Sequence, residues 1–290
     1  MAPINIAASC LVLIVFLPGF WITEEAVSRW AGNAGLALTA ENRRVVRRYL
    51  TWSRRSRRAG GLAGFVLTNL YLGITDDSFT GFPFPQILAG YVLGAILAEV
   101  VVNRPGRRSG AALLVPRRLD DYLPGHVLVL QRGLPVVAAV LLPAAFALSP
   151  FRDLSPAPTN IAPHTLAGFA VPAAFAVGTA VVIEALQRLI VARRQPITGQ
   201  DDLAVDDAIR SSSLHVLAGA GLAMLLFTVG VEVGVLAVFD EASGWPVPLA
   251  WIPLAGLAVG LLLAGVFFWL RLADPHGFRV RRGRQQEVPA

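Results

Sequence analysis

Charged residues in this chain are segregated from long apolar runs, and this segregation restricts the fold more than any other feature. Several of the runs reach the roughly 20 residues that an α-helix needs to cross a ~30 Å hydrocarbon core. The runs cover residues 4–22, 59–75, 84–103, 133–150, 164–190, 213–238 and 247–271. The pattern predicts an all-α, polytopic transmembrane helical bundle of about seven spans.

The overall composition excludes an ordinary soluble domain. The chain is 55% hydrophobic and 15% charged, with a mean hydropathy of +0.60, whereas soluble domains carry about 25% charged residues. The single cysteine, Cys10, lies in the first apolar run. It can form neither an intramolecular disulfide nor a cysteine-based metal site.

Arginine placement predicts the orientation of the spans. All 25 basic residues are arginines, and 24 of them fall in segments 23–58, 104–132 and 188–212 and in the tail from Arg271. The loops on the other side hold only Arg152. Because short basic loops stay in the cytoplasm, the amino terminus is expected outside and the carboxyl terminus inside. The first run has no basic segment before it, so we interpret it as a retained span rather than a signal peptide.

We expect one transmembrane helical domain over residues 1–275 and a disordered basic cytoplasmic tail over residues 276–290. The exclusive use of arginine fits a GC-rich genome, and with the spans it predicts a multi-pass protein of a bacterial plasma membrane. The arginine-rich loops are expected to bind anionic lipid headgroups. A cytoplasmic partner subunit is a second possible partner. No nucleic-acid partner is expected.

The segment "ENRRVVRRYLTWSRRSRR" (41–58) combines this basic charge with apolar side chains. The apolar residues can gather on one side of a helix, namely Val45, Val46, Tyr49, Leu50 and Trp52. The segment is therefore predicted to form an amphipathic helix that lies on anionic lipid at the membrane surface.

Glycines and prolines recur within the spans. Pairs of glycines four residues apart share one helix face and let another backbone approach closely, namely Gly60 and Gly64, Gly90 and Gly94, Gly230 and Gly234, and Gly256 and Gly260. Prolines that free a backbone carbonyl and can kink a helix interrupt several spans, at Pro18, Pro143, Pro172 and Pro253. The glycine pairs predict a tight bundle without saying which helices pair.

Two stretches of the chain repeat a pattern of acidic residues and a histidine. Segments 92–134 and 176–222 contain, in the same order, Glu99, Asp120, Asp121 and His126 in one and Glu184, Asp206, Asp207 and His215 in the other. The glutamate precedes the first aspartate by 21 residues in one segment and by 22 in the other. The repeat predicts two helical hairpins of the same sense with their aspartate pairs at matching places; a chance alignment of alanine-rich spans is the alternative.

These eight residues are weak candidates for binding a metal, because their oxygen and nitrogen atoms suit a hard or borderline cation. Their spacing matches no specific metal motif, so no metal and no cofactor is predicted. The alternative interpretation is structural, with Asp120 and Asp206 as helix N-caps and Glu184 in an ion pair one helical turn away. Basic residues suited to pairing with these acids are Arg117, Arg118, Arg188 and Arg210.

Glu232 is the one acid well inside a predicted span, and an ionisable residue at that depth is a functional candidate. We expect it to face the bundle interior and to bond a polar group such as Asn69 or Tyr71, or a carbonyl freed by Pro253. A structural hydrogen bond with no further role is the alternative for Glu232. No motif for a nucleophile, a phosphate-binding loop or a catalytic triad is present, so catalytic residues stay unknown and an enzymatic activity is not predicted.

The span pattern and the segment "DDAIRSSSLHVLAGAGL" (206–222) resemble uncharacterised multi-pass membrane proteins of high-GC Gram-positive bacteria. The resemblance implies a location in the membrane and carries no activity. The leading functional hypothesis is a transport-related protein, either a small permease or the membrane subunit of a transporter. The alternatives are a membrane-embedded enzyme acting on lipid substrates at the cytoplasmic face, and a scaffold or sensor that docks a cytoplasmic partner.

Overall fold

The computed structural model describes residues 21–75, 84–102, 112–113, 117–148, 166–193, 195–196, 200–242 and 251–273. These residues form a helical bundle made of α2 (Glu24–Asn33), α3 (Ala40–Thr75), α4 (Phe84–Val102), α5 (Gly125–Leu148), α6 (Leu166–Ala192), α7 (Gln200–Ala242) and α8 (Trp251–Ala273). A short 3₁₀ helix, η2 (Leu119–Asp121), precedes α5, and two-residue strands β1 (Ala112–Leu113) and β2 (Gln195–Pro196) pair antiparallel. The expected all-α class is confirmed. Residues 4–20 of the first predicted span and the tail at 276–290 lie outside the described residues.

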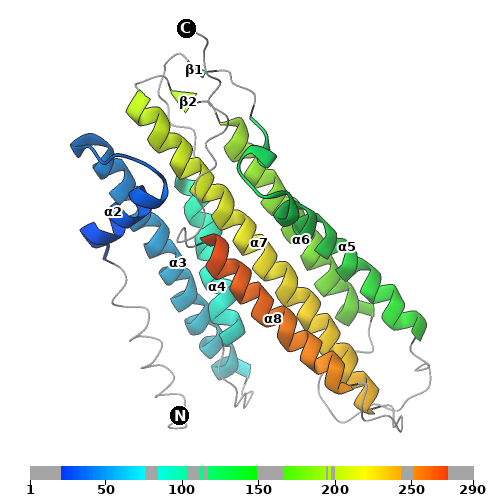
Figure 1. The fold of residues 1–290 in the computed structure, drawn as a ribbon. Coiled ribbons are helices and arrows are strands. Elements are labelled where there is room, and N and C mark those ends of the chain that lie inside the picture. The colour runs from blue at the N-terminus through cyan, green and yellow to red at the C-terminus, as the bar shows by residue number, and fades with distance from the viewer. Residues whose placement is uncertain are drawn as a thin grey trace.

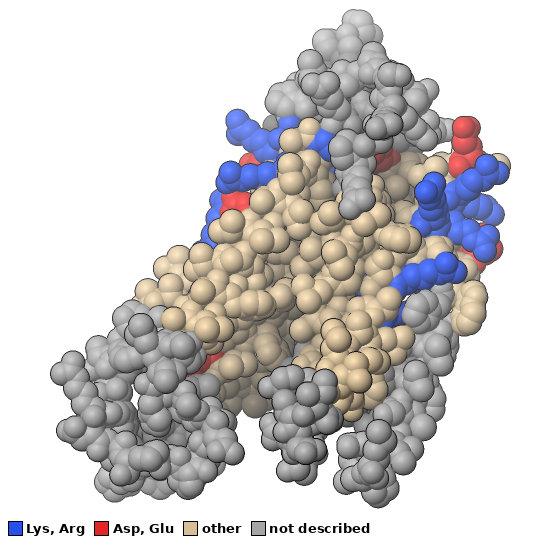
Figure 2. Space-filling view, turned by 180° about the vertical axis from the view of Figure 1, so that it is seen from behind, with Lys and Arg blue, Asp and Glu red and all other residues tan. Residues whose placement is uncertain are grey.

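Helix α7 lies at the centre of the bundle. The long helices α3 to α8 alternate in direction (Figure 1), and α3, α4, α5, α6 and α8 all pack against α7. Arginine side chains gather toward the end of the bundle that carries α2 and the β1–β2 pair, while uncharged side chains cover most of the rest (Figure 2). The structure therefore keeps the separation of charged and apolar segments that the sequence shows.

Three helices in the described part of the chain are long and apolar enough to cross a membrane: Ala170–Ala192, Leu203–Gly234 and Ala255–Leu272. They correspond to the last three predicted spans. In the apolar window of α7 83% of residues are buried, against 28% in α6 and 22% in α8. Shorter apolar helices cover Gln86–Val102 and Gly125–Leu141. The outward apolar faces of α6 and α8 are those of a membrane protein, with α7 shielded by its neighbours.

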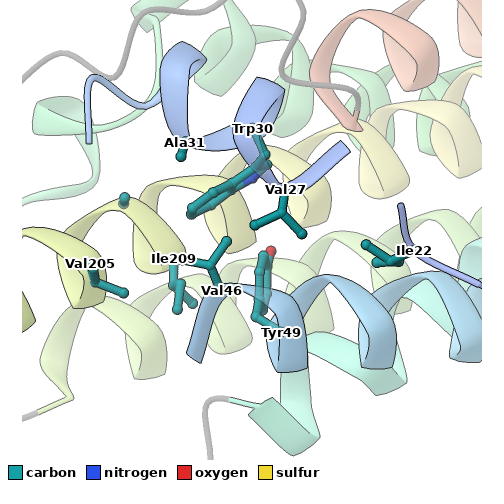
Figure 3. Close-up of a cluster of buried hydrophobic side chains, with 9 residues drawn as sticks. Ile22, Val27, Trp30, Ala31, Val46, Tyr49, Val205 and Ile209 are labelled. Carbon is teal, nitrogen blue, oxygen red and sulfur yellow. The ribbon is translucent and has the colours of Figure 1, made fainter. Parts of the chain in front are cut away.

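The amino-terminal part of α3 packs partly against protein, whereas the prediction placed its whole apolar side on lipid. Val46 and Tyr49 are buried in a cluster with residues of α2 and α7, and the ring of Trp30 from α2 lies 5.9 Å from that of Tyr49 (Figure 3). Val45 and Trp52 are exposed. The apolar residues of 41–58 thus divide between two faces, and α3 runs on without a break to Thr75.

Local capping explains how α2 folds back onto α3. The Thr23 side chain accepts a hydrogen bond from the amide of Ala26 at the start of α2, and Gly35 adopts a positive φ of 65° in the turn that follows α2, a conformation that glycine adopts without strain. At the start of α3, Thr39 and Asn42 exchange hydrogen bonds between side chain and backbone. Both helix starts therefore satisfy backbone donors that would otherwise be unpaired.

Four glycines bring the backbones of α3 and α4 into direct contact. A Cβ atom on Gly60 would lie 2.1 Å from the Gly90 carbonyl oxygen, and one on Gly94 would lie 2.2 Å from the Ser56 carbonyl oxygen. Gly64 meets the Gln86 backbone in the same way. The structure thus identifies the partners that the spacing alone did not give: the two glycine pairs of α3 and α4 pack against each other.

Gly90→Ala is expected to destabilise the bundle, because its Cβ would lie 2.3 Å from the Gly60 carbonyl oxygen and overpacking costs about 1–3 kcal/mol. Gly260→Ala is the matched control, because a Cβ on Gly260 meets nothing within 4 Å. Unfolding of the detergent-purified variants, followed by circular dichroism, measures the difference. Equal midpoints for the two variants would contradict the close contact of α3 with α4.

Candidate functional site

Two carboxylates are buried among the described residues, and their surroundings differ. Glu99 on α4 is 0% exposed and Glu232 on α7 is 6% exposed. A buried carboxylate is costly unless it is hydrogen-bonded or paired with a positive charge. The partners of each group therefore indicate whether the group has a structural or another role.

Glu99 lies in a polar cluster at the junction of α3, α4 and α7. The Ser213 hydroxyl donates a hydrogen bond of 2.5 Å to Glu99 Oε2, and the Tyr49 hydroxyl lies 3.4 Å from Oε1. The buried Ser53 side chain contributes another hydrogen bond. Two helices, α3 and α7, thus supply hydrogen-bond donors to one carboxylate on a third, α4.

Arg57 of α3 gives Glu99 a counter-charge. Its Nη2 atom lies 4.0 Å from Glu99 Oε1, and its guanidinium stacks 5.5 Å from the ring centroid of Trp269 on α8. Burial and, next, the charge of Glu99 raise the pKa of Tyr49, so its hydroxyl keeps the proton that it donates. Because its carboxylate is bonded and charge-compensated, the Glu99 cluster is suited to locking helices together.

Glu232 has no such partners. Both carboxylate oxygens are buried and lack a hydrogen-bond partner within the described part of the chain. Seven residues, or about two turns, separate it from Leu225 on the same face of α7, and Leu225 packs with Ala138 of α5 and Ala176 of α6. The Glu232 side chain therefore lies on the face of α7 that is turned toward α5 and α6.

The environment of Glu232 confirms one part of the prediction and corrects another. The acid is covered by protein, and the opposite face, at Gly230, packs against Ala258 and Leu262 of α8, as expected. Asn69 is not its partner, because Asn69 is exposed and its amide donates to the Phe65 carbonyl. The side chain of Tyr71 lies outside the described residues.

Asp206 anchors a second polar group where α6 ends and α7 begins. It accepts hydrogen bonds from Arg193 and from Arg210, the latter at 3.1 Å. The Arg210 side chain is 1% exposed and also donates to the Val191 carbonyl at 3.3 Å. The pairing of Asp206 with Arg210 that the sequence suggested is confirmed, and Arg193 joins it.

Its neighbour Asp207 binds the segment before α5. The Tyr122 hydroxyl donates to Asp207 Oδ1 at 2.9 Å, and Arg117 lies 3.9 Å away. Burial and, next, the charge of Asp207 raise the pKa of Tyr122, so the hydroxyl remains a donor. The two adjacent aspartates therefore hold different parts of the chain against α7.

Two side-chain contacts join α5 to α6. Glu184 binds Arg188 at 2.5 Å, the predicted pair one turn along α6, and also Arg132 of α5 at 3.1 Å. One turn farther, the buried amides of Gln131 and Gln187 exchange two hydrogen bonds of 3.0 and 3.1 Å. This reciprocal pair satisfies two amides that would be costly to bury alone.

The two repeat segments run in the same sense, because α4 is parallel to α6 and α5 to α7 (Figure 1). Their packing differs: α6 and α7 pack against each other, whereas the described residues of α4 pack mainly against α3 and α7. Glu99 is enclosed, but Glu184 pairs with exposed arginines. The alanine-rich spans align in sequence while their packing differs.

The prediction that Asp120 and Asp206 cap helices is wrong. Helix α7 begins six residues before Asp206, at Gln200, so this aspartate lies inside the helix. Asp120 is an exposed residue of η2, and α5 begins only at Gly125. Asp121 instead accepts a hydrogen bond of 2.8 Å from the Arg118 amide.

The candidate metal ligands do not converge. Within the described residues, no group of three or more histidine, cysteine, aspartate or glutamate side chains is placed to hold a metal ion. His126 is exposed, and His215 is buried with its Nδ1 atom 2.8 Å from the Ser211 carbonyl oxygen.

Sequence reasoning missed several residues of the polar clusters. Tyr49, Ser53 and Arg57 are spaced four residues apart on α3, so they form a polar stripe within an otherwise mixed segment. The run Ser211–Ser213, which enters an apolar span, was a second signal. Both could have been found by asking which other helices carry polar side chains that line up on one face and could meet Glu99.

Neither the family models nor the curated proteins nor the solved structures compared with this chain gave a match.

Asp206→Asn is expected to lower the free energy of unfolding by about 3 kcal/mol, because removing one partner of a buried ion pair leaves the other charge uncompensated. Asp120→Asn should change it by no more than about 0.5 kcal/mol, as surface substitutions do. Chemical denaturation of both variants in the same detergent provides the comparison. Similar losses for both would refute the structural role assigned to Asp206.

Proposed function

We propose that the chain is a seven-span protein of a bacterial plasma membrane, with its amino terminus outside and its arginine-rich loops inside. The three apolar helices of membrane length and the arginines gathered toward one end of the bundle support this proposal. At 1.5 Å per residue, the 43 residues of α7 measure about 65 Å. That exceeds a ~30 Å core, so α7 also extends into the layer where the arginines lie.

Cysteine labelling tests this topology. In a Cys10→Ser background, an impermeant thiol reagent added to intact cells should label cysteines at Ser78 and Ser155. It should leave cysteines at Arg44 and Ser109 unlabelled until the membrane is opened. External labelling of a cysteine at position 44 would show that the orientation is the reverse of the one proposed, with the arginine-rich loops outside.

The function that we propose is transport-related, as a small permease or as the membrane subunit of a transporter, and Glu232 carries this proposal. An ionisable residue that faces the interior of a membrane bundle marks a substrate or ion pathway more often than a packing role. Glu232 sits about 12 Å from Asp240 along α7 and lacks a described partner. A carboxyl group without a fixed partner is the kind of group that a proton or cation pathway uses.

Glu232→Leu separates function from stability. A buried polar group without a partner costs about 1–3 kcal/mol, so leucine at this position is expected to maintain or raise the free energy of unfolding. If Glu232 instead makes a stabilising hydrogen bond, leucine should lower the free energy of unfolding. The measurement is denaturation of the purified variant, and a loss of more than about 1 kcal/mol would assign Glu232 a structural bond.

Proton flux tests the transport role directly. In proteoliposomes that contain a pH-sensitive dye, an imposed pH gradient should collapse faster with the wild-type chain than in protein-free vesicles. Glu232→Gln removes the titratable proton while keeping the shape of the side chain, and it should abolish the difference. Glu184→Gln, at an acid already paired with arginines, is the control that should retain flux. Flux that persists in Glu232→Gln would rule out this residue as the transport group.

A further inference from the structure

An open groove of about 600 Å³ lies where η2 meets the start of α5 and the end of α6. Its size falls within the range of about 300–1,000 Å³ found for ligand pockets. Leu128 and Val191 supply apolar surface, and Asp120 is the acidic residue of the lining. The remaining polar surface comes from arginines, namely Arg117, Arg118, Arg132 and Arg188.

Positive charge exceeds negative charge in the lining of this groove. Arg132 and Arg188 share Glu184, and Arg117 lies near Asp207. The lining itself holds four arginines and one acid, Asp120, whereas Glu184, Asp207 and Asp121, which accepts from the Arg118 amide, lie outside the lining. Arg132 and Arg188 also keep 56% and 70% of their side chains exposed. Each guanidinium has five N–H donors, so these arginines can bind an anion in addition to their present partner.

The exposed faces of α5 and α6 lead toward the groove. On α5, Arg132 shares a face with Val136 and Val140, one and two turns along the helix, and both valines are exposed. On α6, Arg188 lies seven residues after the exposed Val181. The apolar window of α6 ends at Ala192, which lines the groove. Apolar stripes that could face lipid chains thus end at a basic groove.

We propose that this groove binds the phosphate group of an anionic phospholipid. Arginine recognises phosphate through paired, charge-assisted hydrogen bonds, and acyl chains would follow the exposed faces of α5 and α6. The site rests on the insertion of α6 into the membrane, which is part of the proposed function, and does not depend on Glu232. A soluble phosphate would use the same guanidiniums but would gain nothing from the apolar stripes.

Native mass spectrometry of the detergent-purified chain measures the binding. Phosphatidylglycerol should bind at one saturable site, more tightly than phosphatidylcholine. The double variant Arg118→Gln/Arg132→Gln should weaken phosphatidylglycerol binding by about tenfold or more, because each arginine at a membrane surface contributes to anionic-lipid affinity. The matched control Arg44→Gln/Arg48→Gln removes two exposed α3 arginines outside the groove and should leave the affinity unchanged.

Three results would overturn the proposal. Equal binding of phosphatidylglycerol and phosphatidylcholine would show that the site does not recognise the lipid's charge. An equal loss of affinity in the control variant would show that the lipid is attracted by the basic surface in general and not by the groove. Displacement of the lipid by inorganic phosphate at the same concentration would make it a site for soluble anions. If the double variant does not elute as a folded protein, Arg188→Gln, at the most exposed of the paired arginines, serves in its place.

Failure of this site and failure of the proposed function give different results. A chain that alkaline carbonate releases from membranes would lack the spans on which both depend. A chain that stays in the membrane without selecting phosphatidylglycerol would lose the groove alone. Glu232→Leu should bind phosphatidylglycerol like the wild type, so loss of proton flux in that variant leaves the lipid site intact.

Discussion

The packing of five helices around α7 is the constraint on which the remaining structure depends. Small residues allow this enclosure: a Cβ on Gly221 would lie only 3.2 Å from the Ile183 side chain of α6, and one on Gly265 of α8 would lie 3.2 Å from the Ala223 carbonyl oxygen. Once α7 is enclosed, each polar group on its central turns must find a partner within the protein or remain without one. Ser213, which donates to Glu99, and Glu232, which has no described partner, represent these two outcomes.

Glu99 and Glu232 are both buried, but Glu99 connects helices through its partners and Glu232 does not. Glu99 has donors from α3 and α7 and the guanidinium of Arg57, so its burial adds contacts between three helices. Glu232 contributes no described contact of that kind and leaves its desolvation cost uncompensated. A group that is buried without joining elements is one of the places where a functional role is expected. This difference in partners, rather than depth alone, singles out Glu232.

The sequence predicted well those features that depend on one helix at a time. Apolar runs identified α6, α7 and α8, and the order of Glu184 and Arg188 identified an ion pair. Glycine spacing identified the close-packing faces of α3 and α4, but it was wrong for Gly256 and Gly260, where an added Cβ would meet no described atom within 4 Å. Sequence reasoning failed where a partner came from a distant segment. The burial of Val46 and Tyr49 depends on α2 folding back over α3, and no periodicity within 41–58 distinguishes a protein neighbour from lipid. The prediction that Asp206 caps a helix failed for a related reason. Helix α7 begins at Gln200, six residues earlier than the sequence suggested, so Asp206 lies inside the helix.

Internal pairing also limits what the arginine excess can do. The net charge of +6 describes a chain whose arginines bind many of its own acids: Arg43 and Arg47 lie near Glu24, and Arg193 and Arg210 hold Asp206. Charge that is already paired attracts a distant anion weakly, because the opposite charges of the pair cancel at a distance and salt screens the remainder beyond about 8 Å. An anion is therefore recognised where guanidiniums outnumber nearby carboxylates and remain exposed, as they do beside α5 and α6. The distribution of arginine partners, and not the count of arginines, determines where this end of the bundle can bind a lipid.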